Sequence, residues 1–422
     1  MDGIRNINAH MKEETMVNIA VLGYGTVGSG VVEVINTNQK SINQKAGKDI
    51  NVKYVLDLRE FEGDPVQKIL VHDYDVILND KEVDVVVETM GGVEPAYTFS
   101  KNALLAGKSV CTSNKEVVAK HGAELLAIAK ANKVNYFFEA AVGGGIPIIR
   151  PLNTCLTADE ITEITGILNG TTNYILTEMF EKGTAFEDVL KDAQEKGYAE
   201  RNPEADVEGY DACRKIAILT SLVVGEQVDY EDIHTEGITK ITSKDFEYAK
   251  ALNASIKLLG TSKKRDGKFY SMVSPVLIGA NHPLIGVNGV FNGIFVHGNV
   301  VDDVMFYGRG AGKLPTASAV VTDVVAAVKN LGTHVETIWA EQKTELGAFE
   351  ECKSKFFVRM KDKGLDDDQM FDIKNAFGNV LYVKAPGITD ELAFITEEIC
   401  EGEFAKHIEE FTDVYNVIRV NL

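Results

Sequence analysis

The first third of the chain alternates short apolar runs with amphipathic segments. Val17–Leu22 is predominantly apolar, and the stretch VGSGVVEVI that follows a glycine turn has helical potential. The runs VDVVVETMGG and VNYFFEAAV repeat the strand pattern, and KEVVAKHGAELLAIAKANK lies between them as an amphipathic helix. Strands that alternate with helices predict a parallel sheet that binds ligands at the carboxyl ends of its strands.

A glycine fingerprint follows the first apolar run. Gly23, Gly25 and Gly28 stand as G-x-G-x-x-G between a predicted strand and a predicted helix, and Thr26 and Val27 lie inside the motif. The first glycine allows a tight turn, the second lets the backbone approach a pyrophosphate, and the third allows close helix packing. This context favours a dinucleotide site over a strand–helix turn that binds nothing.

Further candidate residues stand where later strands end. Thr89 and Lys115 follow two of them, and Lys115 is either a cofactor or substrate contact or a solvated loop residue. The second strand ends at Asp57, with Arg59 two residues on. The acid suits the ribose hydroxyl of NAD and the arginine the extra phosphate of NADP. The residues leave the choice between NAD and NADP open.

The segment GYAERNPEADVEGYDACRKIAIL (197–219) concentrates acids ahead of a helix that we expect to begin near Glu208. In that helix Asp211 and Lys215 are one turn apart on one face. Such a pair is an ordinary surface ion pair, or else part of a site for a cationic amino group. A lysine with a lowered pKa can take the hydroxyl proton as a hydride leaves, and Lys115 is a candidate for the second cation that lowers it.

Two glycine-containing turns flank this segment in the sequence. GILNGTTNYILTEM (166–179) places Thr171 and Thr172 before a helix, where their hydroxyls can cap the helix or hold a substrate carboxylate. The segment 307–330 is a glycine loop in which Pro315 is placed to start a helix. This loop is either a second approach to a ligand or only a turn and a cap.

Composition excludes several classes of protein. The net charge of the 422 residues is −20, which disfavours nucleic acid as a partner. No run of about 18 apolar residues predicts a membrane span, and the polar first fifteen residues lack the apolar core of a signal peptide. The five scattered cysteines contain no CxxC pair and suit a reducing cytoplasm.

Seven motifs, in order, resemble those of homoserine dehydrogenases. They are GYGTVGSGV, ETMGGVEPA, TSNKE, EAAVGGGIPIIRPL, ILNGTTNYIL, GYAE with PEADVEGYDACRK, and YGRGAGKLPTASAVVTD. The resemblance covers about residues 17 to 340. It implies reversible reduction of L-aspartate 4-semialdehyde to L-homoserine with NADPH or NADH, on the route to threonine, methionine and isoleucine.

The resemblance also implies roles for individual residues. Lys215 would be the proton shuttle, and Lys115 a second lysine near nicotinamide and substrate. The substrate-binding residues would be Glu200, Asp206, Asp211 and Thr171. The cofactor-binding residues would be Gly23, Gly25, Thr26, Val27, Gly28, Thr89, Lys115, Gly310 and Gly312.

The stretch EAAVGGGIPIIRPL raises the question of why glycines follow a carboxylate. Glu139 is expected to end a strand, and glycine carbonyls can curl around a hard cation. By the resemblance, Glu139 and the carbonyls of Val142, Gly144 and Ile146 hold Na⁺ or K⁺. One carboxylate among neutral oxygens suits a monovalent ion better than Ca²⁺. The alternative is that the glycines only permit a tight crossing beneath the substrate.

The C-terminal segment alternates strand-like and helix-like stretches, as in a ferredoxin-like βαββαβ unit. It resembles an ACT domain, although KDKGLDDD replaces the usual DKPGVL-like turn, which puts threonine feedback in doubt. The predicted class is α/β, with a Rossmann-type doubly wound parallel sheet at 16–140, completed by about 308–340. An α+β substrate and dimerisation domain (141–307) and an ACT-like domain (353–422) follow. We expect a monofunctional cytoplasmic homodimer or homotetramer that acts on a small molecule.

Two other functions remain open. An acylating semialdehyde dehydrogenase needs a thiolate nucleophile with a histidine base, and Cys111 and Cys155 have no histidine near them in sequence. This first alternative, another dehydrogenase of amino-acid metabolism, also includes an aspartate dehydrogenase. A regulator that senses the cofactor without catalysis is the other, and the acids and lysine of 200–215 argue against it.

Overall fold

The computed structural model describes residues 16–364 and 366–422, in two compact units. The polar N-terminal segment 1–15 and residue 365, within the KDKGLDDD loop, lie outside the described residues. The first unit comprises the chain to Pro147 together with Ala311–Glu341, and the second comprises Ile148–Gly310 and Gln342–Leu422. No helix in the described part of the chain is long and apolar enough to span a bilayer.

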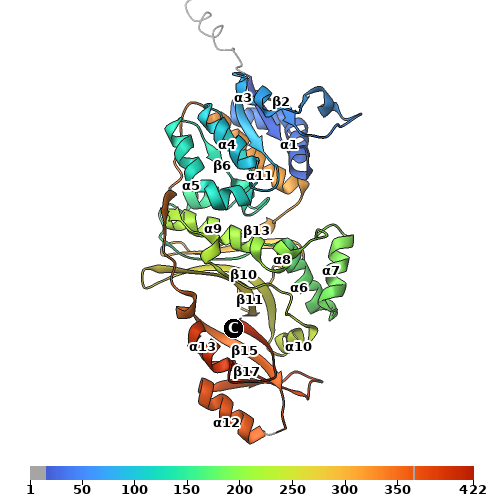
Figure 1. Ribbon diagram of the computed structural model, residues 1–422, viewed down its shortest axis with the longest axis vertical. Coiled ribbons are helices and arrows are strands. Elements are labelled where there is room, and N and C mark those ends of the chain that lie inside the picture. Colours follow the sequence, from blue (N-terminus) through green and yellow to red (C-terminus); the bar gives the residue numbers. More distant parts are fainter. Residues whose placement is uncertain (1–15, 365) are drawn as a thin grey trace, which may run out of the picture. The chain divides into compact units, whose positions relative to one another are not determined.

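The first unit is built on a six-stranded parallel sheet (Figure 1). Its order, β3-β2-β1-β4-β5-β6, is that of the doubly wound dinucleotide-binding fold. The strands are β1 (Val17–Leu22), β2 (Ile50–Leu56), β3 (Leu70–Val71), β4 (Val83–Glu88), β5 (Ser109–Thr112) and β6 (Tyr136–Phe137). Nearly every residue of β1 and β4 is buried, as expected for strands covered on both faces. The predicted α/β class is thereby confirmed.

Helices connect these strands and cover the sheet. They are α1 (Thr26–Thr37), α2 (Gln39–Ala46), η1 (Pro65–Lys68), α3 (Tyr74–Asn79), α4 (Ala96–Leu105), α5 (Lys115–Ala131), η2 (Glu139–Ala141) and α11 (Lys313–Lys329). Helix α11 packs so closely on α1 that a Cβ on Gly30 would lie 2.8 Å from the carbonyl oxygen of Lys313. The segment after residue 310 therefore belongs to the core of the nucleotide-binding unit.

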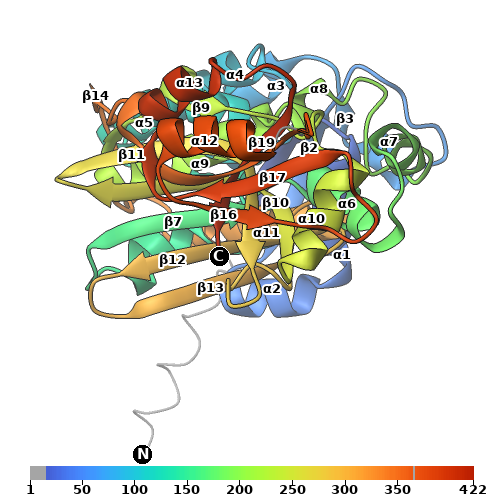
Figure 2. The ribbon, with the colours of Figure 1, turned by 90° about the horizontal axis from the view of Figure 1, so that it is seen from below.

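The second unit is built on one long, mainly antiparallel sheet. Its main path runs β13-β12-β7-β10-β11-β19-β15-β17-β16, and β7, β12 and β13 lie side by side in Figure 2. The strands of this sheet are β7 (Ile161–Ile167), β9 (His234–Thr235), β10 (Ala254–Arg265), β11 (Lys268–Gly279), β12 (Phe291–Gly298), β13 (Asp302–Arg309), β15 (Lys353–Lys361), β16 (Val380–Val383), β17 (Glu391–Thr396), β18 (Ile399–Cys400) and β19 (Val414–Asn421). Strand β8 (Glu226–Gln227) lies outside it. Between the units in sequence lies β14 (Ala340–Lys343).

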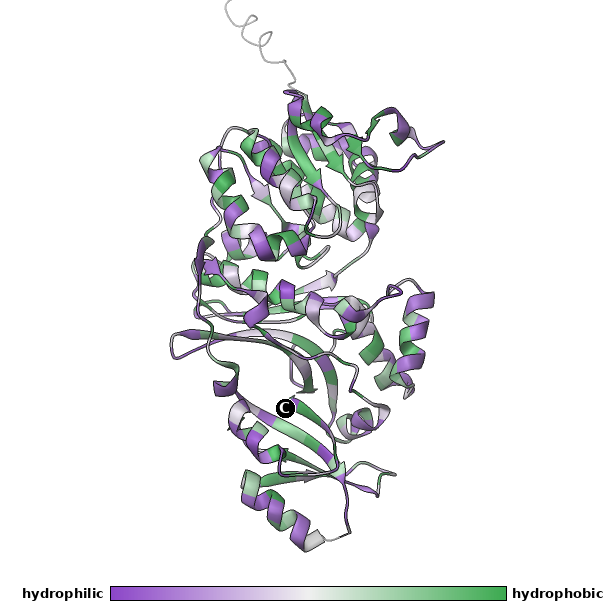
Figure 3. Ribbon diagram, viewed as in Figure 1, coloured by the Kyte–Doolittle hydropathy of each residue, from purple (hydrophilic) through white to green (hydrophobic). Residues whose placement is uncertain are grey.

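The helices of the second unit include those that carry the predicted substrate residues. They are η3 (Pro151–Cys155), α6 (Gly170–Lys182), α7 (Phe186–Glu195), α8 (Glu204–Val207), α9 (Tyr210–Val224), η4 (Tyr230–Asp232), α10 (Ser243–Ala251), η5 (Phe349–Glu351), α12 (Asp366–Phe377) and α13 (Glu401–Ile408). Helices α6 and α9 pack on β10. Strands β10 and β11 are hydrophilic where their hairpin turns and more hydrophobic toward their other ends, whereas helix α7 is mainly hydrophilic (Figure 3).

The C-terminal elements follow the order β15-α12-β16-β17-α13-β19, with the short β18 before α13. Their strand order, β19-β15-β17-β16, is antiparallel throughout and is that of a ferredoxin-like unit. Phe356, Phe377, Phe394 and Phe404 pack in its core. Strand β19 also pairs in parallel with β11, so these C-terminal elements continue the sheet formed by β7 and β10–β13.

Two element boundaries differ from those expected. The strand predicted to end at Glu139 stops at Phe137, because the amide of Glu139 donates to the Asp323 carboxylate of α11 (2.8 Å) rather than to a strand. The helix expected to begin near Glu208 is α9, which begins two residues later at Tyr210, because Gly209, with a positive φ of 83°, separates it from the short α8.

Candidate active site

The turn after β1 has the shape that a pyrophosphate requires. Gly23 has a φ of 89°, and a Cβ on Gly28 would lie only 1.9 Å from the carbonyl oxygen of Gly23. A Cβ on Gly25 would meet nothing within 4 Å, so the space above this residue is open. Helix α1 starts at Thr26 with no side-chain cap and no acidic residue in its first turn. Its N-terminal amides and positive dipole end therefore suit an anion.

The carboxyl end of β2 holds an acid and an arginine that bind each other. Arg59 donates to both oxygens of Asp57, at 2.9 and 2.8 Å, and the amide of Tyr24 donates to the same carboxylate at 2.8 Å. The hydrogen bonds from Arg59 hold the pKa of Asp57 well below its usual range. The side chain of Arg59 is 62% exposed. Asp57 is therefore fixed, whereas Arg59 has room to move.

A buried carboxyl organises the turn that follows β4. Glu88 is fully buried, accepts from the Thr112 hydroxyl at 2.5 Å and accepts from the amide of Met90 at 2.7 Å. Desolvation raises the pKa of Glu88 to about 7, against smaller opposing effects of these hydrogen bonds. The hydroxyl of Thr89 donates to the carbonyls at the end of β1, so it buttresses the glycine turn.

Lys115 is the first residue of α5 and is half-buried. Asn114 caps this helix by accepting from the amides of Glu116 and Val117, and its side chain also donates to the carbonyl of Gly92. The two strand-end turns are thereby tied together. Lys115 thus starts from a fixed backbone position at the carboxyl edge of the parallel sheet.

The glycine stretch behind Glu139 is tightly folded. The Glu139 side chain is buried, and the amide of Ile146 donates to the carbonyl of Gly143 at 2.9 Å. A Cβ on Gly143 would lie 2.4 Å from the Ile146 carbonyl oxygen, and Gly144 has a φ of 57°. A buried carboxylate and several backbone carbonyls therefore belong to one short stretch of sequence, and such donors are of the kind that suits a hard cation.

The acid and lysine of α9 do not form a surface pair. The Nζ of Lys215 lies 2.6 Å from Oδ2 of Asp211, and the two side chains are only 11% and 7% exposed. Nζ also donates to the carbonyl of Leu168 at 2.8 Å. A lysine that is buried, paired and hydrogen-bonded twice is held in one orientation. The interpretation as an ordinary surface ion pair is wrong.

Asn169, which the sequence did not single out, joins the acids of this cluster. Its Nδ2 lies 2.7 Å from Oδ1 of Asp206 and 2.9 Å from Oδ2 of Asp211, while its Oδ1 accepts from the amide of Thr172. Asn169 is thus both the cap of α6 and the donor that holds two carboxylates together. The only signal was its position before a helix, where asparagine is a common cap.

The other predicted substrate residues have separate surroundings. The hydroxyl of Thr171 donates to the carbonyl of Tyr198 at 2.7 Å, which ties the start of α6 to the segment before Glu200. Glu200 is exposed, and its carbonyl accepts from Gln194. No hydrogen bond within the described residues joins the Glu200 carboxylate to the Lys215 cluster.

The second glycine loop, within segment 307–330, contains two glycines with different surroundings. Gly310 follows β13 directly, and a Cβ there would be 1.9 Å from Nδ2 of Asn292. Gly312, with a φ of 118°, precedes α11, which bears no side-chain cap and no acid in its first turn. Pro315 lies within the first turn of that helix.

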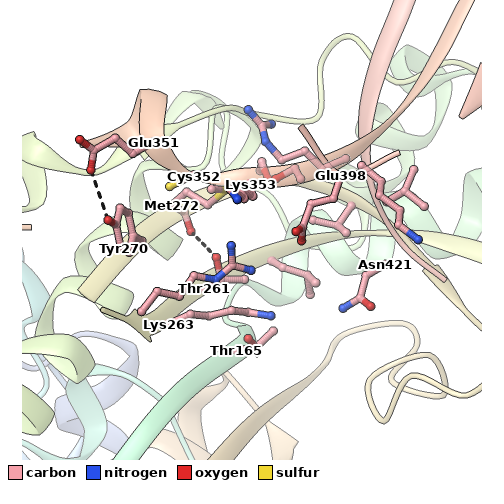
Figure 4. Close-up of a pocket in the computed structure, with 18 of the residues that line it drawn as sticks. Thr165, Thr261, Lys263, Tyr270, Met272, Glu351, Cys352, Lys353, Glu398 and Asn421 are labelled. Atoms are coloured by element: carbon pink, nitrogen blue, oxygen red, sulfur yellow. Dashed lines mark hydrogen bonds between the residues drawn. The ribbon is translucent and has the colours of Figure 1, made fainter. Parts of the chain in front are cut away.

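A cavity of about 670 Å³ lies elsewhere in the second unit (Figure 4). Its floor is formed by side chains of β10 and β11, such as Thr261, Lys263 and Met272, and Cys352 and Arg419 also line it. None of the predicted catalytic, cofactor or cation residues lines this cavity.

Comparison with known proteins gives consistent results. A family model described as "Homoserine dehydrogenase" matches residues 147–325, and one described as "Homoserine dehydrogenase, NAD binding domain" matches residues 23–139. The chain is 37% identical to the homoserine dehydrogenase of Bacillus subtilis (strain 168) over 94% of this chain and 95% of that protein. It is 38% identical to that of Synechocystis sp. over 96% of this chain and 99% of the other.

Solved structures match as well. A homoserine dehydrogenase from Thiobacillus denitrificans superposes with a TM-score of 0.87 at 34% identity, covering 96% of this chain and 98% of that one. A hyperthermophilic archaeal homoserine dehydrogenase, solved with NADPH, superposes with a TM-score of 0.65 at 29% identity, covering 76% and 99%.

Proposed function

The chain belongs to the homoserine dehydrogenase family, and on that premise we propose how its residues reduce L-aspartate 4-semialdehyde reversibly to L-homoserine with NAD(P)H. The single observation that carries the proposal is the buried Lys215–Asp211 pair, which Asn169 links to Asp206. This arrangement combines one proton donor with two carboxylates, as a substrate with an aldehyde and an ammonium group requires.

Lys215 moves the proton in this proposal. The bound nicotinamide supplies the hydride to the aldehyde carbon. Two N–H groups of Nζ are used by Asp211 and Leu168, and a third remains to donate to the aldehyde oxygen as it becomes an alkoxide. Lys215 is neutral after the transfer and regains its proton from solvent. In the reverse direction neutral Lys215 accepts the hydroxyl proton of homoserine.

The acids bind the substrate's ammonium group, whereas the ends of the parallel sheet bind the cofactor. We assign the ammonium to Asp206 and Asp211, with Thr171 and exposed Glu200 at the rim of the site. We assign the pyrophosphate to the turn 23–28, the nicotinamide side to Thr89 and Lys115, and further contacts to Gly310 and Gly312. The open space at Gly25 and the uncapped start of α1 support this assignment.

We assign the choice between NADH and NADPH to the residues at the carboxyl end of β2. Asp57 is fixed by the amide of Tyr24 and suits the ribose hydroxyls of NAD, whereas the exposed Arg59 can turn to a 2′-phosphate. We therefore infer that the enzyme accepts both NADH and NADPH and that Arg59 carries the use of NADPH.

Glu139 and the carbonyls of Val142, Gly144 and Ile146 are proposed to hold Na⁺ or K⁺. The ion would fix the glycine stretch and would not contact the reacting carbon. The C-terminal unit, which we propose to be ACT-like, would assemble a homodimer or homotetramer rather than sense threonine. Inhibition by micromolar threonine that is lost on truncation near residue 350 would contradict that role.

The test of the function is turnover of L-aspartate 4-semialdehyde, followed by loss of NADH or NADPH absorbance, with L-homoserine identified as the product. An acylating semialdehyde dehydrogenase would instead need NAD(P)⁺ and phosphate, and would reduce NAD(P)⁺ to NAD(P)H while oxidising the same aldehyde to an acyl phosphate. A non-catalytic regulator would bind the nucleotide and turn nothing over. Either result would overturn the proposal.

A further inference from the structure

A charge cluster, in which Arg419 and Glu401 are buried and Glu236 is 40% exposed, connects the last strand of the chain to the segment before α10. Arg419, on β19, donates to both oxygens of Glu236, at 2.8 and 2.9 Å, and to both oxygens of Glu401, at 2.7 and 2.9 Å. The side chains of Arg419 and Glu401 are only 10% and 4% exposed. Burial acts to raise the pKa of Glu236, but the hydrogen bonds from His234 and Arg419 outweigh it and lower the pKa to about 2. Glu236 therefore stays ionised and held by the arginine.

The backbone just after Glu236 is hydrogen-bonded to the end of α8. The amide of Glu236 donates to the carbonyl of Val273 on β11 at 2.8 Å. Two residues later, the amide of Ile238 donates to the carbonyl of Val207, the last residue of α8, also at 2.8 Å. One short segment is thus pinned at one end by Arg419 and at the other by the helix that carries Asp206.

Two glycines allow the two backbone segments to lie in direct contact here. A Cβ on Gly237 would lie 2.2 Å from the Val207 carbonyl oxygen, and one on Gly209 would lie 3.2 Å from the carbonyl oxygen of Glu236. Gly209 begins α9, whose first turns carry Asp211 and Lys215. Because the backbones touch without side chains between them, a shift of segment 235–238 must move the α8–α9 turn.

We infer that Arg419 is a positioning residue: through Glu236 it holds segment 235–238 against the α8–α9 turn and so sets the spacing of Asp206 and Asp211. The inference rests on the proposed substrate role of these acids. It gives the C-terminal unit a part in substrate binding besides any role in assembly. Arg419 itself touches neither substrate nor cofactor in this scheme.

The experiment compares Arg419→Met with Arg359→Met in the full-length protein. Arg359 is the control, because it is also buried, on the adjacent β15, but forms ion pairs with Asp245 of α10 and Glu391 of β17 instead. Both substitutions leave buried carboxylates without their arginine, so both should lower Tm. Only Arg419→Met should raise the KM for aspartate semialdehyde, by about tenfold for a displacement below 1 Å, with the KM for NADPH unchanged.

Further measurements keep the inference testable if Arg419→Met folds poorly. Arg419→Lys should restore part of the substrate affinity, and Glu236→Gln should raise the same KM. Hydrogen–deuterium exchange should quicken at the amides of 204–215 in Glu236→Gln but not in Arg359→Met. Equal KM values in the Arg419 and Arg359 variants, or unchanged exchange at 204–215 in Glu236→Gln, would overturn the inference. If the wild type did not turn over the aldehyde, the proposed function would fail. The positioning role of Arg419 would then be decided by hydrogen–deuterium exchange at 204–215 alone.

Discussion

Asn169→Asp is the substitution that separates the two roles of Asn169. The cap of α6 uses Oδ1, which an aspartate retains, whereas the clamp on the two acids uses Nδ2, which an aspartate lacks. The variant places a third carboxylate oxygen 2.7 and 2.9 Å from two others. It therefore tests the clamp while preserving the cap.

The size of the effect follows from the bonds that are lost. A hydrogen bond to a charged group contributes about 1.5–3 kcal/mol, so losing two costs about 3–6 kcal/mol. At about 1.4 kcal/mol for each factor of ten, kcat/KM for aspartate semialdehyde should fall by about 10²–10⁴-fold. Asn169→Ser keeps a capping oxygen and loses the same two bonds, but it adds no negative charge beside the acids, so its loss should be smaller than that of Asn169→Asp.

The control for Asn169→Asp is Asn173→Asp, one turn later in α6. Nδ2 of Asn173 donates to the carbonyls of Val287, Gly289 and Phe291, and not to the acids. This variant should lower Tm while leaving kcat/KM for the folded enzyme close to that of the wild type. If Asn169→Asp and Asn173→Asp had equal kcat/KM values, or if Asn169→Asp matched the wild type, the clamp would have no part in catalysis.

Three further predictions concern the nucleotide-binding unit. Because the pKa of Glu88 is raised from 4.5 to about 7, the folded state binds its proton more tightly, and the free energy of unfolding should fall as the pH rises between these values. Glu88→Gln should remove this decline in denaturant titrations, and an unchanged decline would refute the assignment. Arg59→Ala should raise the kcat/KM ratio of NADH to NADPH at least about tenfold through loss of a phosphate contact, and an equal ratio would exclude Arg59. Glu139→Gln should weaken the activation of turnover by K⁺ or Na⁺ added to tetramethylammonium buffer. If the wild-type rate did not depend on either ion, the glycines would serve only to permit tight packing of the chain.

The parallel sheet and its glycine turn were predictable because their signals are local. Val17–Leu22 is a buried strand with the predicted bounds, and the nearest atom to a Cβ on Gly28 would be the carbonyl oxygen of Gly23, only five residues earlier. The βαββαβ order of the C-terminal elements followed from hydrophobic alternation in the same way.

Long-range contacts were not predictable from one sequence. Asn169 contacts acids 37 and 42 residues away, so its motif showed only a helix cap. The strand expected to reach Glu139 ended early because Asp323, 184 residues away, accepts its amide. Whether Asp211 and Lys215 were exposed also depended on the fold, since spacing on a helix face says nothing about what covers that face. The cation site stays a prediction.

The most direct test of the account is turnover by Lys215→Ala, measured with and without added primary amine. The account predicts that kcat falls by about 10²–10⁴-fold, that the Kd for NADPH is unchanged in fluorescence titration, and that a small amine restores part of the rate by supplying the missing proton donor. Lys215→Ala with a wild-type kcat, or a loss of activity matched by an equal loss of NADPH binding, would contradict the assignment of Lys215 as the group that moves the proton.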